Sequence, residues 1–486
     1  MIIGSTTSDD SHNAVPLETP EGTPKSGYFR IVHDPPGTRQ TPRFLLSSLE
    51  SSCDYLVASL VTQRISEHRE VRLNSDRTTP PVWLMGMCNA SMGFSNGIVL
   101  FALPQLLAAG HVPESKIATI TAVAFSPNFW SVFFAPMLDV HFSRRWYATI
   151  LAAASAIFTA TSIFSLHHLF LLEILALLAT ATVNLSSSAM GGWFSNITDH
   201  KDKNILSKWM NISLICGIGV TSMLGGQLVR HLPMGFAAVL VGVIVFLPAT
   251  IFAIIPAPGP DRRLAGESFI QFTREVASLL RRREVVIVLF LFLTPCSSFA
   301  LTNLLGGLGD DFHASAGAIS IAGGIGTFVP GIIGCALFPI FARRLPLRFF
   351  YLANGIVGSV FTLSLLALPH ATSTFALAIF GEFLFQAVSF SVQIGIVFEA
   401  IGPDNPLAAT TFSFLTAAGN IPVAYMMVAD GRAYSAHGIA GSFGLDASVC
   451  IGACLLAWWL LSKFDRRSFR TSLEIPEVAE ILRREN

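Results

Sequence analysis

An acidic side chain interrupts one of the longest apolar stretches of the sequence. Glu382 lies within Ile379–Gln386, Gln386 follows it after four residues, and Gln393 follows after seven more. At this spacing the three side chains share one face of a helix. A charge at the centre of a membrane span costs about 2.5–3.5 kcal/mol, so it has to face a cavity or a partner. We predict that the three residues line one cavity wall and that Glu382 binds a proton or a solute; a structural hydrogen bond between helices is the alternative.

Two amides and a second acid extend this predicted pathway. Asn89 and Asn96 are seven residues apart, which places them two turns along one helical face. A buried amide either hydrogen-bonds a solute or joins two helices. Glu173 lies in the outer part of another apolar run, near a predicted outer mouth. We therefore include Asn89, Asn96 and Glu173 in the predicted substrate or proton pathway.

An acid and two bases follow one another at the end of a further apolar run. These are Asp139, Arg144 and Arg145. Such a charge cluster can hold neighbouring helices in one of two states, so that breaking it shifts the balance between them. Ordinary anchoring of basic residues on the cytoplasmic side is the alternative. We predict that the three residues form a cytoplasmic gate.

The composition places these residues in a membrane protein. Of the 486 residues, 52% are hydrophobic and only 13% are charged, and 31 Lys and Arg balance 31 Asp and Glu. Soluble domains carry about 25% charged residues. The low charge density excludes a soluble cytosolic enzyme and a wholly disordered chain. The zero net charge excludes a nucleic-acid-binding protein that acts through a basic field.

Twelve apolar runs are long enough to cross about 30 Å of hydrocarbon as helices of about 20 residues. They are continuous and lack the period-two alternation of membrane strands. Six lie near Val82–Ala108, Ile117–Val140, Tyr147–Leu166, Leu169–Asn196, Trp209–Val229 and Met234–Ile255, and six lie near Val285–Leu308, Ala316–Phe341, Phe349–Leu368, Phe375–Ile401, Ala408–Ala429 and Ile439–Leu461. The sequence therefore predicts an all-α membrane protein with twelve transmembrane helices in two six-helix bundles.

The basic residues orient these spans. Loops that follow even-numbered spans carry fourteen Lys and Arg, whereas the loops on the other side carry three. Because basic loops remain in the cytoplasm, both termini are expected there. We predict a disordered cytoplasmic tail at 1–79, a first bundle at 80–255, a cytoplasmic linker at 256–284, a second bundle at 285–463 and a cytoplasmic tail at 464–486.

Short motifs in the first half carry a family resemblance. They are Met92–Gly97 followed by Leu103-Pro104 in the first span, Ala135–Asp139 at the end of the second span, and Arg144–Trp146 at the start of the third. Together with the two-bundle layout, they resemble the AmpG-like branch of the major facilitator superfamily, which includes muropeptide permeases and acetyl-CoA transporters. The resemblance is best over residues 82–230. It implies a carrier of the bacterial inner membrane that is often coupled to protons.

Two positions depart from related patterns. The AmpG-like pattern often has a lysine eight residues before the acid of span two, and Ser131 stands there in this chain. The missing cation argues against an anionic substrate such as a muropeptide. The drug-antiporter signature of span five is incomplete, because Thr221-Ser222 precede Gly225-Gly226 where Gly-Pro is expected. This departure argues against drug efflux.

These observations predict a secondary active transporter that moves a small solute by alternating access, coupled to protons. An efflux carrier for amphipathic compounds and a non-transporting membrane receptor are the alternatives. The sequence has no HExxH metal motif and no P-loop, and we predict no enzymatic activity, catalytic residue, metal or cofactor. The expected partners are a small-molecule substrate, protons and the lipid bilayer. Nucleic acid is not an expected partner, and we expect a monomer.

Overall fold

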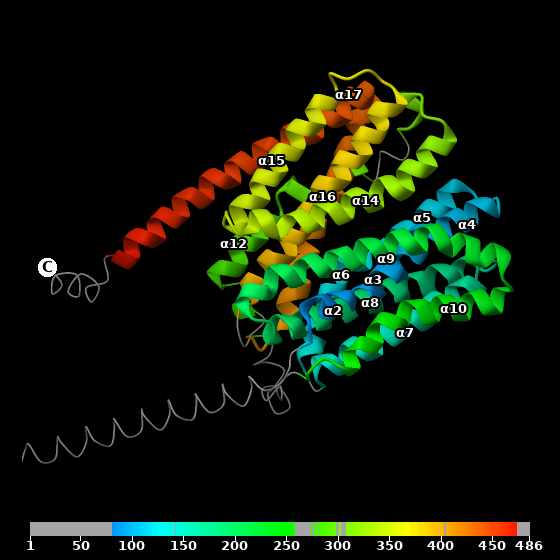
Figure 1. Cartoon of the computed structure of the whole chain (residues 1–486), viewed down its shortest axis with the longest axis horizontal. Helices are drawn as coiled ribbons and strands as arrows, with labels where there is room; N and C mark the ends of the chain where they lie inside the picture. The colour runs from blue at the N-terminus through cyan, green and yellow to red at the C-terminus, as the bar shows by residue number, and fades with distance from the viewer. Residues whose placement is uncertain are drawn as a thin grey trace, which may run out of the picture. The chain divides into compact units, whose positions relative to one another are not determined.

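The computed structural model describes residues 80–140, 142–257, 274, 277–279, 281–297, 301–302, 308–402 and 405–473. The predicted tail 1–79 and most of the predicted linker 256–284 lie outside the described residues. Within the described ranges, every regular element is a helix (Figure 1). Eight of these helices are long and apolar enough to cross a membrane.

The first bundle contains the helical segments up to residue 253. They are α2 (Val82–Met87), α3 (Ala90–Asn96), the π-helix η1 (Gly97–Ala102), α4 (Leu103–Ala109), α5 (Glu114–Phe125), α6 (Pro127–Trp130), the 3₁₀-helices η2 (Ser131–Phe133) and η3 (Ala135–Asp139), α7 (Arg144–Phe164), α8 (Leu169–Ile197), η4 (His200–Asp202), α9 (Lys203–His231), α10 (Met234–Phe246) and η5 (Leu247–Ala253). Helical segments thus occupy the first six predicted spans.

The second bundle follows from residue 283. Its segments are α12 (Arg283–Phe292), η6 (Pro295–Ser297), η7 (Asp310–Phe312), α14 (Ala316–Ala342), α15 (Leu347–Leu365), α16 (Thr372–Ile401) and α17 (Ala408–Leu473). The helical assignment of α17 runs through a kink at Gly438, where φ is 62° and ψ is −150°. Because only glycine adopts such angles readily, α17 bends there and contains two helices. The second of them continues ten residues beyond the predicted bundle boundary at residue 463.

Prolines divide the second predicted span into short pieces. Pro127 begins α6 and Pro136 lies in the first turn of η3. A proline has no backbone N–H and its ring displaces the preceding turn, so it kinks or breaks an α-helix. The segment ends where Val140 takes an extended conformation. Asp139 therefore lies at the very end of the span, and α7 begins a few residues later at Arg144.

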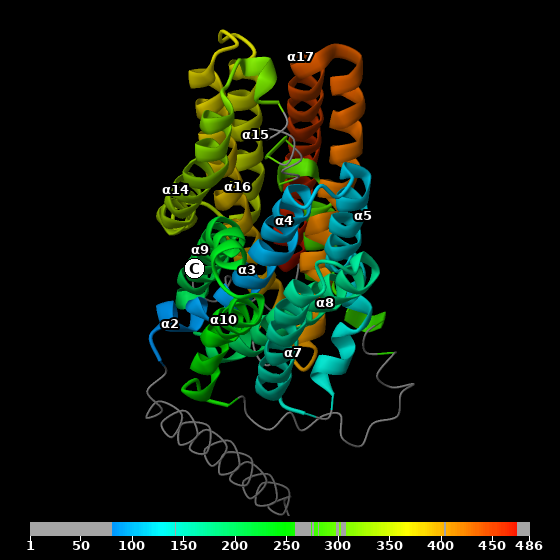
Figure 2. The same ribbon diagram turned by 90° about the vertical axis from the view of Figure 1, so that its right-hand side faces the viewer.

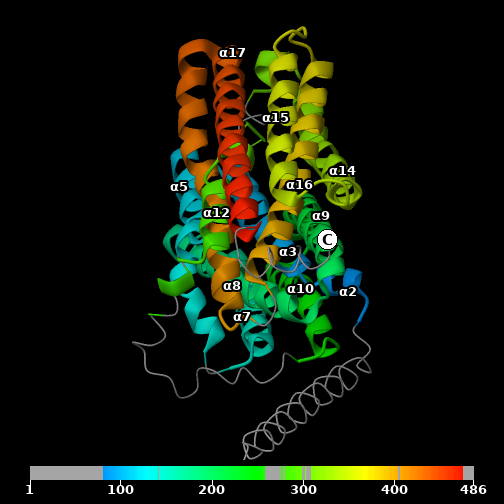
Figure 3. The same cartoon turned by 90° about the vertical axis from the view of Figure 1, so that its left-hand side faces the viewer.

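The two bundles occupy separate halves of the described structure (Figures 2 and 3). Spans two, four and ten end, and spans three, five and eleven begin, on the same side of the membrane, which we call the Asp139 side. One buried apolar cluster reaches across both bundles there and includes Trp193 and Phe252 of the first bundle and Phe398 and Phe412 of the second. The bundles are therefore packed against each other at the Asp139 side.

The buried clusters of the opposite side each belong to one bundle. One contains Ile98, Leu107 and Leu172 of the first bundle, and the other contains Phe375 and Phe443 of the second. Large apolar side chains such as Phe133, Phe170 and Trp146 are exposed on the outside of the bundles. Apolar surface of this kind is what a helix presents to lipid.

Candidate functional site

A cavity of about 270 Å³ lies between the two bundles. Segments of both halves line it, from α2–α3 and η1 through α8 and α9 to α16 and the first part of α17. The polar part of the lining consists of amides and hydroxyls, and it includes six asparagines and two glutamines. No described residue of the lining is charged. The cavity can therefore hydrogen-bond a solute, but it offers no countercharge to an anion or a cation.

Four of the residues predicted for the pathway line this cavity. Asn89 and Asn96 come from the first bundle, and Gln386 and Gln393 come from the second. Asn89 is held in place on two sides, because its Nδ2 donates to the carbonyl of Met210 at 3.0 Å and its Oδ1 accepts from the Ser187 hydroxyl at 3.2 Å. The π-helix η1 follows Asn96 directly, and π-helical turns frequently mark functional sites.

Two buried amide atoms at the cavity have no hydrogen-bond partner. They are Nε2 of Gln393, which can donate, and Oδ1 of Asn184, which can accept. An unpaired buried polar atom costs about 1–3 kcal/mol. Gly419 leaves room for the Gln393 amide, because a Cβ at position 419 would lie 2.0 Å from Nε2. A solute that both accepts and donates hydrogen bonds would satisfy the two atoms.

Glu382 lies outside this cavity. It lines a separate pocket of about 50 Å³ within the second bundle, and its carboxylate accepts a hydrogen bond from Thr362 at 2.5 Å. Gln386 lines both the pocket and the cavity. Glu173 is half-buried on α8 and lines neither space. The structure therefore brings the four predicted amides together at the cavity and leaves both predicted acids outside it.

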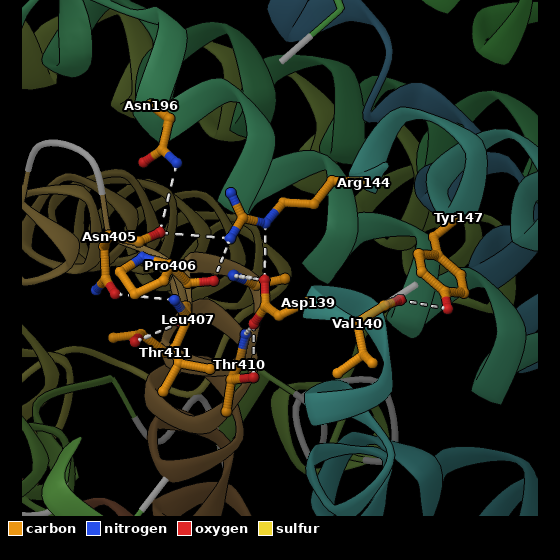
Figure 4. Close-up of polar contacts among 11 residues, drawn as sticks. Asp139, Val140, Arg144, Tyr147, Asn196, Asn405, Pro406, Leu407, Thr410 and Thr411 are labelled. Atoms are coloured by element: carbon orange, nitrogen blue, oxygen red, sulfur yellow. Dashed lines mark hydrogen bonds and ion pairs between the residues drawn. The ribbon is translucent and has the colours of Figure 1, made fainter. Parts of the chain in front are cut away.

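Asp139 and Arg144 form a buried ion pair at the end of the second span (Figure 4). Nε of Arg144 donates to Oδ1 of Asp139 at 2.7 Å, and the two side chains are 1% and 0% exposed. Further contacts of the pair reach the second bundle. Nη2 of Arg144 donates to the carbonyls of Asn405 at 3.3 Å and Pro406 at 2.6 Å.

The Asp139 carboxylate also binds the first turn of α17. Oδ1 accepts from the backbone N–H of Ala409 at 3.3 Å, and Oδ2 accepts from the N–H and the hydroxyl of Thr410 at 2.8 and 2.7 Å. The first N–H groups of a helix have no partner within the helix, and they carry a partial positive charge that favours an anion. An acid of the first bundle thus caps a helix of the second.

Arg145 does not join this network. Its guanidinium donates to the carbonyl of Ala253 at the end of η5, within the first bundle. Of the three predicted gate residues, Asp139 and Arg144 are thus in contact, whereas Arg145 binds within the first bundle. Sequence reasoning missed Asn405 and Thr410. The only local signal was the break in the apolar pattern before Ala408.

Further contacts close the Asp139 side. Nζ of Lys203 donates to the carbonyl of Phe398 at 3.1 Å, and the Ser207 hydroxyl donates to the carbonyl of Ser391 at 2.5 Å. Gly192 of α8 faces the start of α17 so closely that a Cβ on it would lie 2.4 Å from the backbone nitrogen of Ala409. The cavity is therefore closed on this side by both polar and backbone contacts between the bundles.

A serine with the Gly-x-Ser-x-Gly spacing of a hydrolase nucleophile lies in the first span, at Gly93–Gly97. In hydrolases this serine stands on a sharp turn between a strand and a helix. Here Ser95 lies within α3, is fully buried, and contacts the hydroxyls of Ser155 and Thr159, both at 3.1 Å. These contacts join α3 to α7, so the motif serves helix packing.

Comparison with known proteins agrees with this architecture. Residues 85–411, about two thirds of the chain, match the Major Facilitator Superfamily family. Similar solved structures include the E. coli fucose:proton symporter FucP, at 14% identity and TM-score 0.61 over 78% of this chain and 97% of that chain. The proton:xylose symporter XylE matches at 14% identity and TM-score 0.58 over 78% and 94%.

The human organic anion transporter MFSD10 matches at 16% identity and TM-score 0.58, over 77% of this chain and 98% of that chain. No curated protein matches the sequence. The structural likeness at these identities concerns the fold alone. The family match over most of the chain shows that the chain belongs to this superfamily. The eight helices long enough to cross a membrane are consistent with that membership. The chain belongs to the major facilitator superfamily and is a multi-pass membrane transporter.

Proposed function

We propose that the protein is a proton-coupled secondary transporter of a small, uncharged polar solute. The amide-lined and uncharged cavity between the bundles carries this proposal. Ligand pockets typically start at about 300 Å³, so a cavity of about 270 Å³ suits a solute of monosaccharide size. Two proteins of similar fold are symporters that couple fucose or xylose to protons.

Transport proceeds by alternating access in this proposal. The two bundles rock about the cavity, so that it opens to one side of the membrane at a time. The buried ion pair of Asp139 and Arg144 acts as the gate of the Asp139 side, since it joins the first bundle to the start of α17. The state described here is closed at this gate.

Uptake into proteoliposomes under an inward proton gradient tests the function. The probes are radiolabelled L-fucose, D-xylose and N-acetylglucosamine as neutral solutes and D-glucuronate as an anion. We expect accumulation of at least one neutral solute and no accumulation of glucuronate. Preferential uptake of the anion, or uptake that ignores the gradient, would contradict the proposal.

Replacing Gln393 with leucine should weaken solute binding. Gln393→Leu removes the unpaired donor Nε2 from the cavity at nearly constant volume. Loss of one buried hydrogen bond of about 1–3 kcal/mol raises the KM for the transported solute about tenfold. Gln227→Leu is the matched control, because Gln227 is an exposed glutamine of α9. Initial uptake rates over a range of solute concentrations give the KM; equal values for both variants would remove Gln393 from the binding site.

Replacing Glu382 with glutamine should uncouple uptake from protons. Glutamine keeps the size of the side chain but cannot gain or lose a proton, so Glu382→Gln is expected to lose accumulation against a gradient and to keep solute exchange. The measurement compares accumulation under an imposed pH gradient with counterflow in its absence. A variant that retains full proton-driven accumulation would show that Glu382 has no coupling role.

An efflux carrier for amphipathic compounds is the second candidate. The apolar part of the cavity lining favours it, because the rings of Phe101, Phe125, Phe390 and Phe412 lie there. Aromatic side chains provide a large apolar contact area for an amphipathic ligand. Ethidium efflux from loaded proteoliposomes, without uptake of the neutral probes, would favour this candidate over the sugar-like solute.

The AmpG-like branch remains our proposal for the family subgroup. It rests on the motifs Met92–Gly97, Ala135–Asp139 and Arg144–Trp146. Ser131, which stands where that branch often has lysine, lines the cavity and fits a neutral solute. We place the protein in the bacterial inner membrane as a monomer, with both termini in the cytoplasm. A reporter fused after Asn486 that is active only outside the cell would overturn this orientation.

A further inference from the structure

A second polar pocket lies within the second bundle. It has a volume of about 50 Å³ and is enclosed by η6, α15, α16 and α17. Two acids line it, Glu382 from α16 and Asp446 from the second part of α17, together with polar side chains such as Thr362 and Asn354. No described residue of its lining is a lysine, arginine or histidine.

A third acid, Asp430, lies next to Asp446. The side chain of Asp430 is fully buried. Its carboxyl group interacts with that of Asp446. Asp430 lies eight residues before the Gly438 kink and Asp446 lies eight residues after it. At about 1.5 Å per helical residue, both lie some 12 Å from the kink, on the side of the membrane opposite to Asp139.

We propose that this pocket is a proton-binding site in which Asp446, supported by Asp430, takes up protons from the side of the Gly438 kink and exchanges them with Glu382. The proposal deepens the proposed function, since it assigns the route of the coupling proton. Each step moves one proton between a carboxyl group and pocket water, with no other bond made or broken. The solute does not enter this pocket.

Charge balance within the bundle supports protons as the ligand. Among the described residues, the other titratable groups that we identify near the pocket are Cys296, Cys450, Cys454 and Tyr425, and all four are neutral when protonated. None of them supplies a positive charge to the acids. Ionised carboxylates that meet no positive charge are costly in a low-dielectric interior. One sodium ion in about 50 Å³ would neutralise a single charge, whereas protons neutralise each acid separately.

Gln386 connects the pocket to the solute cavity. It is the residue of α16 that lines both spaces, and its Nε2 donates to the hydroxyl of Thr302 at 3.3 Å. It also lies one helical turn from Glu382. A change in the charge of Glu382 therefore acts on a side chain that faces the solute. This arrangement couples the two sites without placing the acid in the cavity.

Infrared difference spectra of the full-length protein in liposomes test the proposal without any solute. Buried protonated carboxyl groups give a C=O absorption that disappears as the pH is raised. With three acids contributing, Asp446→Asn should lose about one third of this signal, and Asp446→Glu should keep it. Asp199→Asn is the control, because Asp199 is an exposed acid in a loop. If Asp446→Asn does not fold, Asp430→Asn is expected to show the same loss.

Equal signals in the wild type and in both asparagine variants would overturn the proposal. Removal of the signal by sodium chloride at constant pH would also overturn it, in favour of a sodium site. The infrared signal could titrate as expected although the protein transports none of the neutral probes. This result would support the proton site and contradict the proposed function. In proton-driven uptake, Asp446→Asn should be about tenfold slower with unchanged counterflow, and Asp446→Glu should restore the rate.

Discussion

Asp139→Asn is expected to open the Asp139 side of the protein and to abolish accumulation of solute. The substitution leaves Arg144 buried without its anion, at a side-chain exposure of 1%. It also places an amide where a carboxylate accepts from the N–H groups of Ala409 and Thr410. Removing one partner of a buried ion pair costs about 3–5 kcal/mol. Because 1.4 kcal/mol corresponds to a factor of ten, the closed state should lose about a hundredfold or more in population.

The labelling rate of a cysteine introduced at Ser413 measures this opening. Ser413 lines the cavity on α17, one turn beyond Thr410. A membrane-impermeant maleimide added on the Asp139 side should label Ser413→Cys much faster in the Asp139→Asn background. Arg145→Gln is the neighbouring comparison, and we expect an unchanged rate because Arg145 binds Ala253 instead. A rate unaltered by Asp139→Asn would exclude a gate at this ion pair.

Exchanging the two charges provides a sharper version of the same experiment. A variant with Asp139→Arg and Arg144→Asp again has one acid and one base at these two positions, so it can form an ion pair. It does not restore an acceptor for the first N–H groups of α17, because the guanidinium at position 139 can only donate. We therefore expect the exchanged variant to stay open, whereas a simple ion pair would recover. Rescue by the exchange would show that the cap on α17 contributes nothing.

Gly192→Ala is expected to separate the bundles at the same side. A Cβ on Gly192 would lie 2.4 Å from the backbone nitrogen and 2.6 Å from the Cα of Ala409, and 2.8 Å from the carbonyl carbon of Ala408. These are backbone atoms, which cannot rotate away as a side chain does. Overpacking of this kind costs about 1–3 kcal/mol, so the closed state should become about tenfold or more less populated.

Gly226→Ala is the matched control for this substitution. Gly226 lies in α9, and a Cβ on it would meet no atom within 4 Å. Both substitutions gain the same intrinsic helix propensity, so the difference between them isolates the contact with α17. The Ser413→Cys labelling rate should rise for Gly192→Ala and stay unchanged for Gly226→Ala. Equal rates, with both variants unfolding at the wild-type temperature, would contradict the close approach of α8 and α17.

The fold was predictable because lipid imposes a simple rule on the sequence. A spanning helix must be apolar over its length, and the described residues of each of the twelve predicted runs include helical segments. The amides were predictable for a related reason. Asn89, Asn96 and Gln393 interrupt apolar runs, and an interruption has to face something polar. All three line the cavity.

The position of Glu382 was not predictable from its helical face. Glu382 and Gln393 are eleven residues apart and do share a face, but they differ in depth by about 16 Å along α16. The cavity between the bundles reaches Gln393, whereas Glu382 faces the pocket inside its own bundle. Helical periodicity predicts which face of the helix a side chain lies on. It does not predict how far along that face a cavity extends.

The partners of Asp139 were hidden for a different reason. Thr410 lies 271 residues away in the sequence, and its hydroxyl and N–H group carry no pattern that marks them as a cap for an acid of another bundle. Asp430 and Asp446 were missed as well, although both interrupt apolar segments. They lie on either side of Gly438, and only the bend of α17 brings them together.

The apolar cluster shared by the bundles also sets how transport responds to temperature. Opening the Asp139 side has to hydrate Phe398, Phe412 and their neighbours, which are buried between the bundles. Hydration of apolar surface raises the heat capacity, and the attraction between such surfaces weakens on cooling. Cold should therefore favour water at the Asp139 side, and the turnover rate should give a curved Arrhenius plot even in lipids that stay fluid.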